Sequence, residues 1–430
     1  MYTNYIYFLA HIRAVSLTSQ IDKGKHFILE ESKKGEEKLL QTSGRKAARL
    51  KNIAPSGIRR LFTLTPNTPE LISLGIGEPD FTPPEHVLEA AREAITNGKT
   101  HYTPSSGIPE LREALAKKYS QEYNLSYNPE NEIIVTIGAT EAVSLALLAS
   151  INPGDEVLIP DPGFVCYKPA VLIAGGVPVS MPMLENDGFR LDVEAVTSLI
   201  TKKSRVIIIN SPNNPTGSIL TRDELAKLAD LAVENNLIAV SDEVYEKILY
   251  DNAKHHSLAT FPEMRERTIV VNSFSKTYAM TGFRVGYALG PEDMVSAMLL
   301  VHQFAVACVD GPSQYAASAA LKGPQDFVAE MVSKFDARRR LVYKRLNEIE
   351  GFNCSLPKGA FYAFPSIEAF RTTSASFSDF LLKEAKVVVT PGSSFGKYGE
   401  GFLRLSYATA YEKIDKALDE IEQAVKKLET

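Results

Sequence analysis

Short runs of apolar, mostly β-branched residues recur through the middle of this chain and constrain its fold more than any other feature. The runs are residues 133–136, 156–159, 205–209, 237–240 and 268–271. Helical patterns, for example at residues 140–151 and 222–234, separate most of these runs. Strands buried on both faces read as continuous apolar runs, and helices between them make parallel crossovers. We therefore expect an α/β fold with a mostly parallel sheet that helices cover on both faces.

The two ends of the chain add further elements to this core. Helical patterns are expected at residues 84–96, 109–123 and 324–350 and from Ala410 onward, and strands at residues 359–364, 387–390 and 402–406. A chain of 430 residues is longer than one ordinary core. The sequence therefore predicts a large domain over residues 109–324. A smaller α+β domain is expected from residues 45–108 together with 325–430.

Residues 1–44 form an extension of different composition. The stretch from residue 20 to 51 is rich in Lys and Glu and has the pattern of a flexible or partly helical segment. Residues 2–17 are apolar and faintly resemble a targeting peptide, although His11 and Arg13 interrupt them. We expect a dispensable extension, with a targeting role or a misassigned start codon left open.

The composition argues against several classes of function. A formal net charge of −5 lacks the excess of basic residues expected of a general nucleic-acid binder. No stretch is long and apolar enough to span a membrane. The three cysteines, Cys166, Cys308 and Cys354, lie far apart, which favours reduced thiols in a cytoplasmic protein. There is no HExxH motif, and the pair at residues 255–256 has the pattern of a surface turn, so no metal is predicted.

Lys276 is the main candidate for chemistry. It follows the apolar run at residues 268–271 and stands eight residues before Arg284. A lysine that can form a Schiff base, close to an arginine that can hold a phosphate, is what pyridoxal phosphate requires. A solvated Lys and Arg on a surface loop is the alternative. The position at a strand's end, where α/β enzymes place their chemistry, favours the catalytic interpretation.

Four more motifs follow apolar runs in the same way. They lie at residues 138–142, 160–167, 210–217 and 241–245. Each alone is explained by a turn or a helix N-cap. The glycine turn at residue 138 leads into a helix and would aim backbone N–H groups at an anion. Because all four motifs follow predicted strands, they indicate one active site at one edge of the sheet.

From about residue 45 to the C-terminus, the chain resembles the class I/II aminotransferases, close to the archaeal and bacterial aspartate and aromatic enzymes. The motifs are Gly-Glu-Pro-Asp-Phe at 77–81, Tyr-Thr-Pro at 102–104, Gly-Ile-Pro-Glu-Leu-Arg at 107–112, Asn-Asn-Pro-Thr-Gly at 213–217, Ser-Phe-Ser-Lys at 273–276 and Arg-Leu-Ser-Tyr-Ala at 404–408. The resemblance implies a fold-type I transferase that depends on pyridoxal 5′-phosphate.

The resemblance also implies roles for residues around the cofactor ring. Lys276 would form the Schiff base and then move a proton between the substrate Cα and the cofactor. Asp242 would face the pyridine nitrogen and keep it protonated, while Asn214 and Tyr245 would hydrogen-bond the phenolic oxygen. Phe164 would lie against the ring face.

At the other end of the cofactor, the resemblance implies a phosphate site. Arg284, the Ser273 hydroxyl and the backbone N–H groups of Ala139 and Thr140 would hold the phosphate. Tyr102 would reach the phosphate of a neighbouring subunit, which implies a homodimer with shared active sites.

Arg404 is implied as the clamp for the substrate α-carboxylate, with Gly77 and Asn214 beside it. The expected function is transfer of the α-amino group of an L-amino acid, aspartate or aromatic, to 2-oxoglutarate. A pyridoxal-phosphate-dependent carbon–sulfur β-lyase is the alternative enzyme, because it would share the lysine, the aspartate and the phosphate site. A ligand-sensing regulator is a third hypothesis, but residues 1–44 are short for a DNA-binding module and lack a helix-turn-helix pattern.

Overall fold

A computed structural model describes residues 47–53 and 70–428 of the chain. The chain divides into two compact units, Met1–Asn52 and Ile53–Thr430. In the first unit the described residues contain one short 3-10 helix, η1 (Ala48–Leu50). The predicted extension at residues 1–44 lies outside the described residues. All that follows concerns the second unit.

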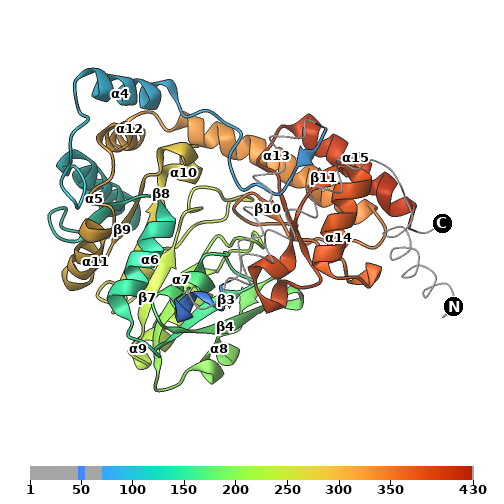
Figure 1. The fold of residues 1–430 in the computed structure, drawn as a ribbon, viewed down its shortest axis with the longest axis horizontal. Coiled ribbons are helices and arrows are strands. Elements are labelled where there is room, and N and C mark those ends of the chain that lie inside the picture. Colours follow the sequence, from blue (N-terminus) through green and yellow to red (C-terminus); the bar gives the residue numbers. More distant parts are fainter. Residues whose placement is uncertain (1–46, 54–69, 429–430) are drawn as a thin grey trace. The chain divides into compact units, whose positions relative to one another are not determined.

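A single sheet of eight strands, in the order β2-β9-β8-β7-β6-β3-β4-β5, forms the centre of this unit (Figure 1). The strands are β2 (Ile133–Thr136), β3 (Glu156–Asp161), β4 (Val177–Leu184), β5 (Arg190–Leu191), β6 (Ser204–Asn210), β7 (Ile238–Asp242), β8 (Thr268–Ser273) and β9 (Gly286–Leu289). The five strands from β4 to β8 in this order pair in parallel, whereas β9 is antiparallel to both β2 and β8. The predicted α/β fold with a mostly parallel sheet is confirmed.

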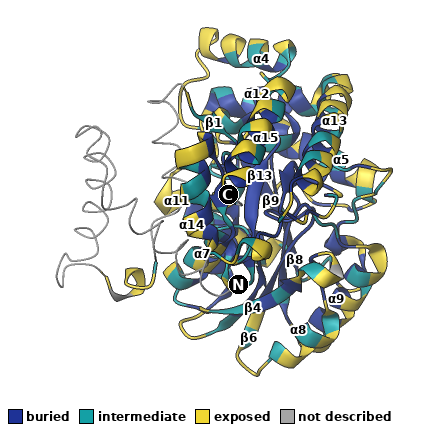
Figure 2. Cartoon of the chain, turned by 90° about the vertical axis from the view of Figure 1, so that its right-hand side faces the viewer, coloured by how far each residue is buried: buried dark blue, intermediate teal, exposed yellow. Residues whose placement is uncertain are grey.

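Alternating side chains along the strands bury both faces of this sheet. In β6, Val206 and Ile208 pack toward one cluster of apolar residues, and Ile207 and Ile209 pack toward another on the opposite face. The first cluster includes residues of α6 (Ala139–Ser150), α7 (Tyr167–Ile173) and α11 (Glu292–Ala305). The second includes α8 (Val193–Leu199) and α9 (Arg222–Glu234). Figure 2 shows the strands mostly as buried residues and the outer sides of helices such as α9 as exposed ones.

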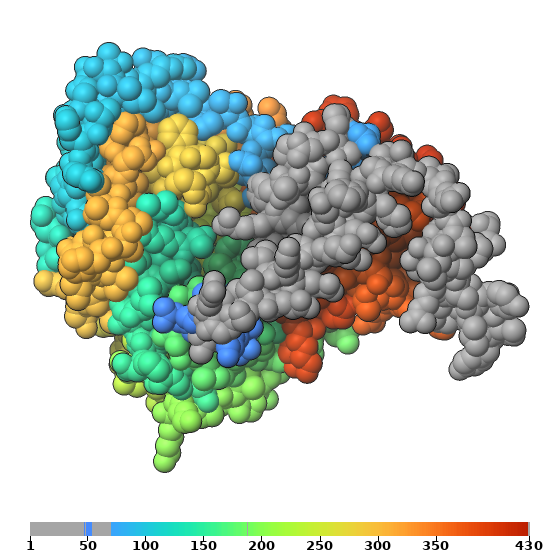
Figure 3. Space-filling view, in the orientation of Figure 1, coloured from blue at the N-terminus to red at the C-terminus, as the bar shows by residue number. Residues whose placement is uncertain are grey.

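Helices from distant parts of the sequence pack together beside β2 and β9. They are α4 (Glu85–Thr96), α5 (Pro109–Tyr123) and α12 (Gly311–Lys322), and both α4 and α5 contact α12. In Figure 3, α11 and α12 form an orange part of the surface beside the cyan residues of α4. The short helix α10 (Phe274–Thr277) directly follows β8.

Most of the C-terminal residues pack in a separate apolar cluster around two small sheets. One has the order β10 (Tyr362–Ala363), β13 (Leu403–Ser406), β12 (Thr390–Pro391); the other pairs β1 (Ile72–Ser73) in parallel with β11 (Val387–Val388). The helices here are α13 (Asp326–Glu348), α14 (Ser374–Phe380) and α15 (Tyr411–Lys426). The predicted strand at 387–390 is therefore two strands in different sheets, and the predicted strand at 359–364 is only two residues long. The division into domains at residues 109 and 324 stays a prediction.

Candidate active site

The carboxyl ends of three neighbouring strands bring the sequence motifs together. Asn210 ends β6 and stands in register with Asp242, which ends β7, and β8 ends next to them at Ser273. The Asn210 side chain connects two motifs, because its Nδ2 donates to the Asp242 carbonyl at 3.0 Å and its Oδ1 accepts from the Asn214 N–H at 3.0 Å. Sequence reasoning treated Asn210 only as a turn residue. The structure shows that it fixes the relative positions of two predicted site residues.

Lys276 lies on α10, whose N-cap is Ser273. The Ser273 hydroxyl oxygen accepts from the Ser275 N–H at 3.3 Å, and the Lys276 Nζ donates to the Gly77 carbonyl at 2.6 Å. Burial lowers the pKa of Lys276 to about 8, and the charges of Arg404 and Arg284 act in the same direction. A larger fraction of this amine is therefore neutral near physiological pH than for an ordinary lysine, as a nucleophile or base requires.

Asp242 is a buried carboxylate, 4% exposed. The Tyr167 hydroxyl donates to its Oδ2 at 2.7 Å, and the Val244 N–H donates to its Oδ1 at 3.4 Å. Burial raises the pKa of Asp242 to about 6, while these two hydrogen bonds act in the opposite direction. No role was predicted for Tyr167, although it belongs to the motif at residues 160–167. Phe164, from the same motif, packs edge-on against Tyr167 with ring centroids 5.8 Å apart.

Arg404 is buried and contacts the Asn214 side chain. Its Nη1 donates to Asn214 Oδ1 at 3.1 Å and its Nη2 donates to the Gly75 carbonyl at 2.5 Å. Its Nε is buried and has no hydrogen-bond partner among the described residues. Burial lowers the pKa of Arg404. The Nε–H of the guanidinium is therefore available for a further acceptor, such as a ligand carboxylate.

Tyr362 was not predicted from the sequence, yet it lies between three predicted residues. Its hydroxyl is 2.8 Å from the Tyr245 hydroxyl, and the Arg404 guanidinium carbon lies 4.5 Å from the centre of its ring. A Cβ added at Gly77 would clash with the Tyr362 hydroxyl, so the chain can approach this closely only as glycine. Tyr362 comes from β10, far from these partners in sequence, and no local pattern marks it.

The start of α6 and Arg284, which were predicted to hold an anion, lie side by side. Gly138 is the N-cap of α6 with a φ of 74°, and the first N–H groups of a helix have no intrahelical acceptor. A Cβ at Gly138 would lie 2.6 Å from Arg284 Nη2, so the glycine leaves the space in which the guanidinium approaches the turn. These groups fit a phosphate in both charge and geometry. Tyr102, by contrast, is 91% exposed and lies at the surface of this chain.

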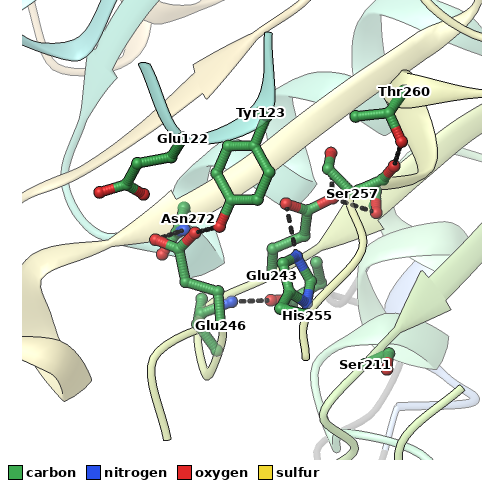
Figure 4. Close-up of polar contacts among 12 residues, drawn as sticks. Glu122, Tyr123, Ser211, Glu243, Glu246, His255, Ser257, Thr260 and Asn272 are labelled. Carbon is green, nitrogen blue, oxygen red and sulfur yellow. Dashed lines mark hydrogen bonds and ion pairs between the residues drawn. The ribbon is translucent and has the colours of Figure 1, made fainter. Parts of the chain in front are cut away.

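Glu243, Glu246 and His255 lie close enough together to hold a metal ion (Figure 4). Each carboxylate oxygen already accepts a hydrogen bond, however, from Ser241, Ser257 and His255 for Glu243 and from Lys118, Asn272 and Tyr123 for Glu246. Burial alone would raise the pKa of Glu246, but Lys118, Lys247 and His255 together lower it to about 2. The cluster is therefore a buried network of ion pairs and hydrogen bonds.

The prediction of a surface turn at residues 255–256 is wrong for His255, whose side chain is 6% exposed. Its partner Glu243 lies on another segment, and the sequence around His255 gives no sign of that contact. Among the described residues, no helix has the length and apolarity needed to cross a membrane. All three cysteines are free thiols.

The arrangement of an amine, a carboxylate and an anion site at the carboxyl edge of a parallel sheet defines an α/β enzyme site. The family model for aminotransferase class I and II matches residues 69–421. An aspartate aminotransferase from Pyrococcus abyssi is 49% identical over 380 residues, which are 88% of this chain and 97% of that protein. Aromatic-amino-acid aminotransferase 2 from Thermococcus litoralis is 47% identical over the same shares of both chains.

Solved structures agree with this result. The crystal structure of an aromatic aminotransferase from Pyrococcus horikoshii is 48% identical, has a TM-score of 0.82 and covers 86% of this chain and 99% of that one. The chain therefore belongs to the class I and II aminotransferases. The predicted fold-type I architecture and the predicted enzyme class are both confirmed.

Proposed function

We propose that this chain binds pyridoxal 5′-phosphate through Lys276 and transfers the α-amino group of an L-amino acid to 2-oxoglutarate. The observation that carries the proposal is the buried amine of Lys276, with a lowered pKa, in one site with the buried Asp242 carboxylate and the buried Arg404 guanidinium. The bound cofactor would supply an aldehyde that condenses with amines and a ring that withdraws electrons from the amino acid Cα.

The residues of the site fit this cofactor at both ends. Arg284, Ser273 and the N–H groups of Ala139 and Thr140 would bind its phosphate. Asp242 would hold a proton on the ring nitrogen, and Phe164 would cover the ring and exclude water. These assignments agree with the hydrogen-bond donors at the phosphate end and with the space that Gly138 leaves for Arg284.

Three further residues would act on the reacting groups. The Lys276 amine, when neutral, would accept the Cα proton and return it to the neighbouring carbon of the cofactor. Asn214 and Tyr245 would donate hydrogen bonds to the phenolic oxygen. Asn214 already accepts a hydrogen bond from Arg404, and the Tyr245 hydroxyl is hydrogen-bonded to that of Tyr362. Such donors stabilise negative charge without having to reorganise during the reaction.

The free Nε of Arg404 supports its role as the substrate carboxylate clamp. A planar guanidinium forms two parallel charge-assisted bonds with a carboxylate, so binding would exchange at least one present contact, with Asn214 or Gly75, for the ligand. Gly77 would allow the close approach of the same carboxylate.

The donor is proposed to be aspartate or an aromatic amino acid, since the relatives named above include an aspartate and an aromatic-amino-acid aminotransferase. A carbon–sulfur β-lyase would share most of the site. The relatives described here are named as aminotransferases, which gives the lyase no support.

We also propose a cytoplasmic homodimer in which Tyr102 contributes to the phosphate site of the second subunit. Tyr102 is 91% exposed, and Phe304, on the surface helix α11, is 84% exposed. Aromatic side chains exposed to this degree are typical of surfaces that a partner covers. The free thiols agree with a reducing compartment.

The absorption spectrum of the purified protein with added cofactor tests the proposal. A coloured band should form and should convert when L-aspartate or L-tyrosine is added without an oxo acid; 2-oxoglutarate should then restore it. Lys276→Ala should stay folded and lose turnover, because it lacks the amine that forms the Schiff base and moves the proton. A wild-type protein that forms no coloured band would contradict the proposal, and release of pyruvate and ammonia from a cysteine-type substrate would favour the lyase.

A further inference from the structure

Tyr167 makes the short hydrogen bond to the carboxylate that the proposed mechanism uses. Its hydroxyl lies 2.7 Å from Asp242 Oδ2, and its side chain is 1% exposed. The Val244 N–H reaches the other oxygen at 3.4 Å, and Asn210 binds the Asp242 main chain rather than the carboxylate. Among the described residues, Tyr167 therefore provides the strongest support of this carboxylate.

We propose that Tyr167 is a positioning residue, whose hydroxyl keeps the Asp242 carboxylate ionised and fixed in orientation, and whose ring supports Phe164. This inference rests on the proposed function, because it concerns the group that would hold a proton on the cofactor ring. It gives a role to a residue of the motif at 160–167 that had none in the sequence analysis.

Burial makes such a donor necessary. A carboxylate withdrawn from water tends to take up a proton unless hydrogen bonds or cations stabilise its charge. Burial is the main cause that raises the pKa of Asp242, and the Tyr167 hydrogen bond is the largest influence in the other direction. A neutral Asp242 would no longer stabilise a positive ring nitrogen.

The other charged and titratable groups facing Asp242 do not replace this donor. They are Glu243, Tyr245, Lys276 and Cys166. Glu243 raises the pKa of Asp242, and Lys276 lowers it less than Tyr167 does. Burial and the Asp242 charge also raise the pKa of Tyr167 well above its usual value, so its phenol stays protonated and remains a donor.

The local structure holds Tyr167 in place relative to Phe164. Tyr167 is the first residue of α7, and its N–H donates to the Phe164 carbonyl at 3.1 Å. Their rings meet edge to face, at 79°. One turn of chain therefore sets both the donor to Asp242 and the aromatic ring proposed to cover the cofactor.

Tyr167→Phe removes the hydroxyl and keeps the ring, so it tests the donor alone. We expect kcat to fall about tenfold, the size of one hydrogen bond to a charged group, while KM for the amino acid stays within about twofold. In the cofactor-free protein, the carboxyl infrared band of Asp242, identified by its loss in Asp242→Asn, should titrate about one pH unit higher. Tyr127→Phe is the matched control, because the buried Tyr127 hydroxyl has no partner among the described residues.

A double-mutant cycle separates positioning from general packing. If Tyr167 acts through Asp242, the Tyr167→Phe change should cost little further single-turnover rate in an Asp242→Asn background. An equal loss in both backgrounds, or an unchanged kcat together with an unchanged Asp242 titration, would overturn the inference. The infrared measurement needs no cofactor, so it still decides the inference if the wild-type protein forms no coloured band and the proposed function fails.

Discussion

At the scale of single residues, the site depends on charged groups held away from water. Lys276, Asp242 and Arg404 all have pKa values that burial shifts toward the neutral form. Buried titratable groups of this kind occur preferentially at functional sites, because the folded protein must stabilise them by other contacts. The free-energy cost of burying these groups should therefore appear in the pH dependence of folding stability.

Lys276 gives a pH-dependent stability with a defined sign. Its pKa falls from 10.5 to about 8 on folding, so between these values the unfolded chain binds more protons than the folded one. Stability should therefore rise with pH across this window. We expect the cofactor-free wild type to gain stability relative to Lys276→Met between about pH 8 and about pH 10, in urea unfolding. Parallel pH profiles for the two proteins would show that the amine is not perturbed.

Many predicted site residues could be found from sequence because each follows a strand in a compact motif. Asn214, Asp242, Ser273 and Lys276 lie within a few residues of a strand's end, and the parallel sheet brings those ends together. Tyr362 could not be found in this way, since it reaches Tyr245 across more than a hundred residues of chain. Its role depends on packing that no local pattern encodes.

At the scale of elements, the segment at residues 75–81 joins the site to α13. Its Gly77 carbonyl binds Lys276, while Asp80 forms a two-pronged ion pair with Arg338 of α13 at 2.7 and 2.9 Å. Phe81 packs edge-on against Phe335 of the same helix. The position of α13 therefore affects a segment that contacts the Lys276 amine.

Arg338→Lys should loosen this segment, because lysine cannot form the two parallel bonds. Loss of about 1 kcal/mol of positioning energy would raise KM for the amino acid about fivefold, with cofactor affinity little changed. Steady-state kinetics and cofactor titration measure the two effects. Arg345→Lys is the matched control, since Arg345 lies on the same helix but pairs with Asp415 and Asp419 of α15. Equal KM values for both variants would argue against the connection.

The sequence predicted the elements whose patterns were strong. All five apolar runs became strands of the central sheet, whereas β4, β5 and β9 were missed. β4 contains two prolines and a serine, and β9 is a four-residue strand that begins with Gly286. Gly286 lies so close to the Gly138 backbone that a side chain would clash there. Its place in the sheet is set by this tertiary contact rather than by strand propensity.

At the scale of the whole molecule, the proposed homodimer requires a contact surface, and the exposed Phe304 of α11 is a candidate for it. Phe304→Glu places a charge on a side chain that is now 84% exposed. If a second subunit covers this surface, burial of the charge should convert dimers to monomers and greatly lower activity. Light scattering and kinetics measure both effects. Tyr411→Glu, on α15 at 43% exposure, is the control; an unchanged mass for Phe304→Glu would place the interface elsewhere.

The pairing of β2 with β9 has a consequence for the synthesis of this protein on the ribosome. Ile133 pairs with Leu289, so β2 must wait for about 150 further residues before its partner exists. At roughly 5–20 residues per second, this delay is on the order of ten to thirty seconds. During that time β2, at the edge of the future sheet, has no strand beside it. The turn at Gly138 that follows β2 also lacks Arg284. The nascent chain therefore completes the proposed anion site late, and the edge of β2 stays unpaired until translation passes residue 289.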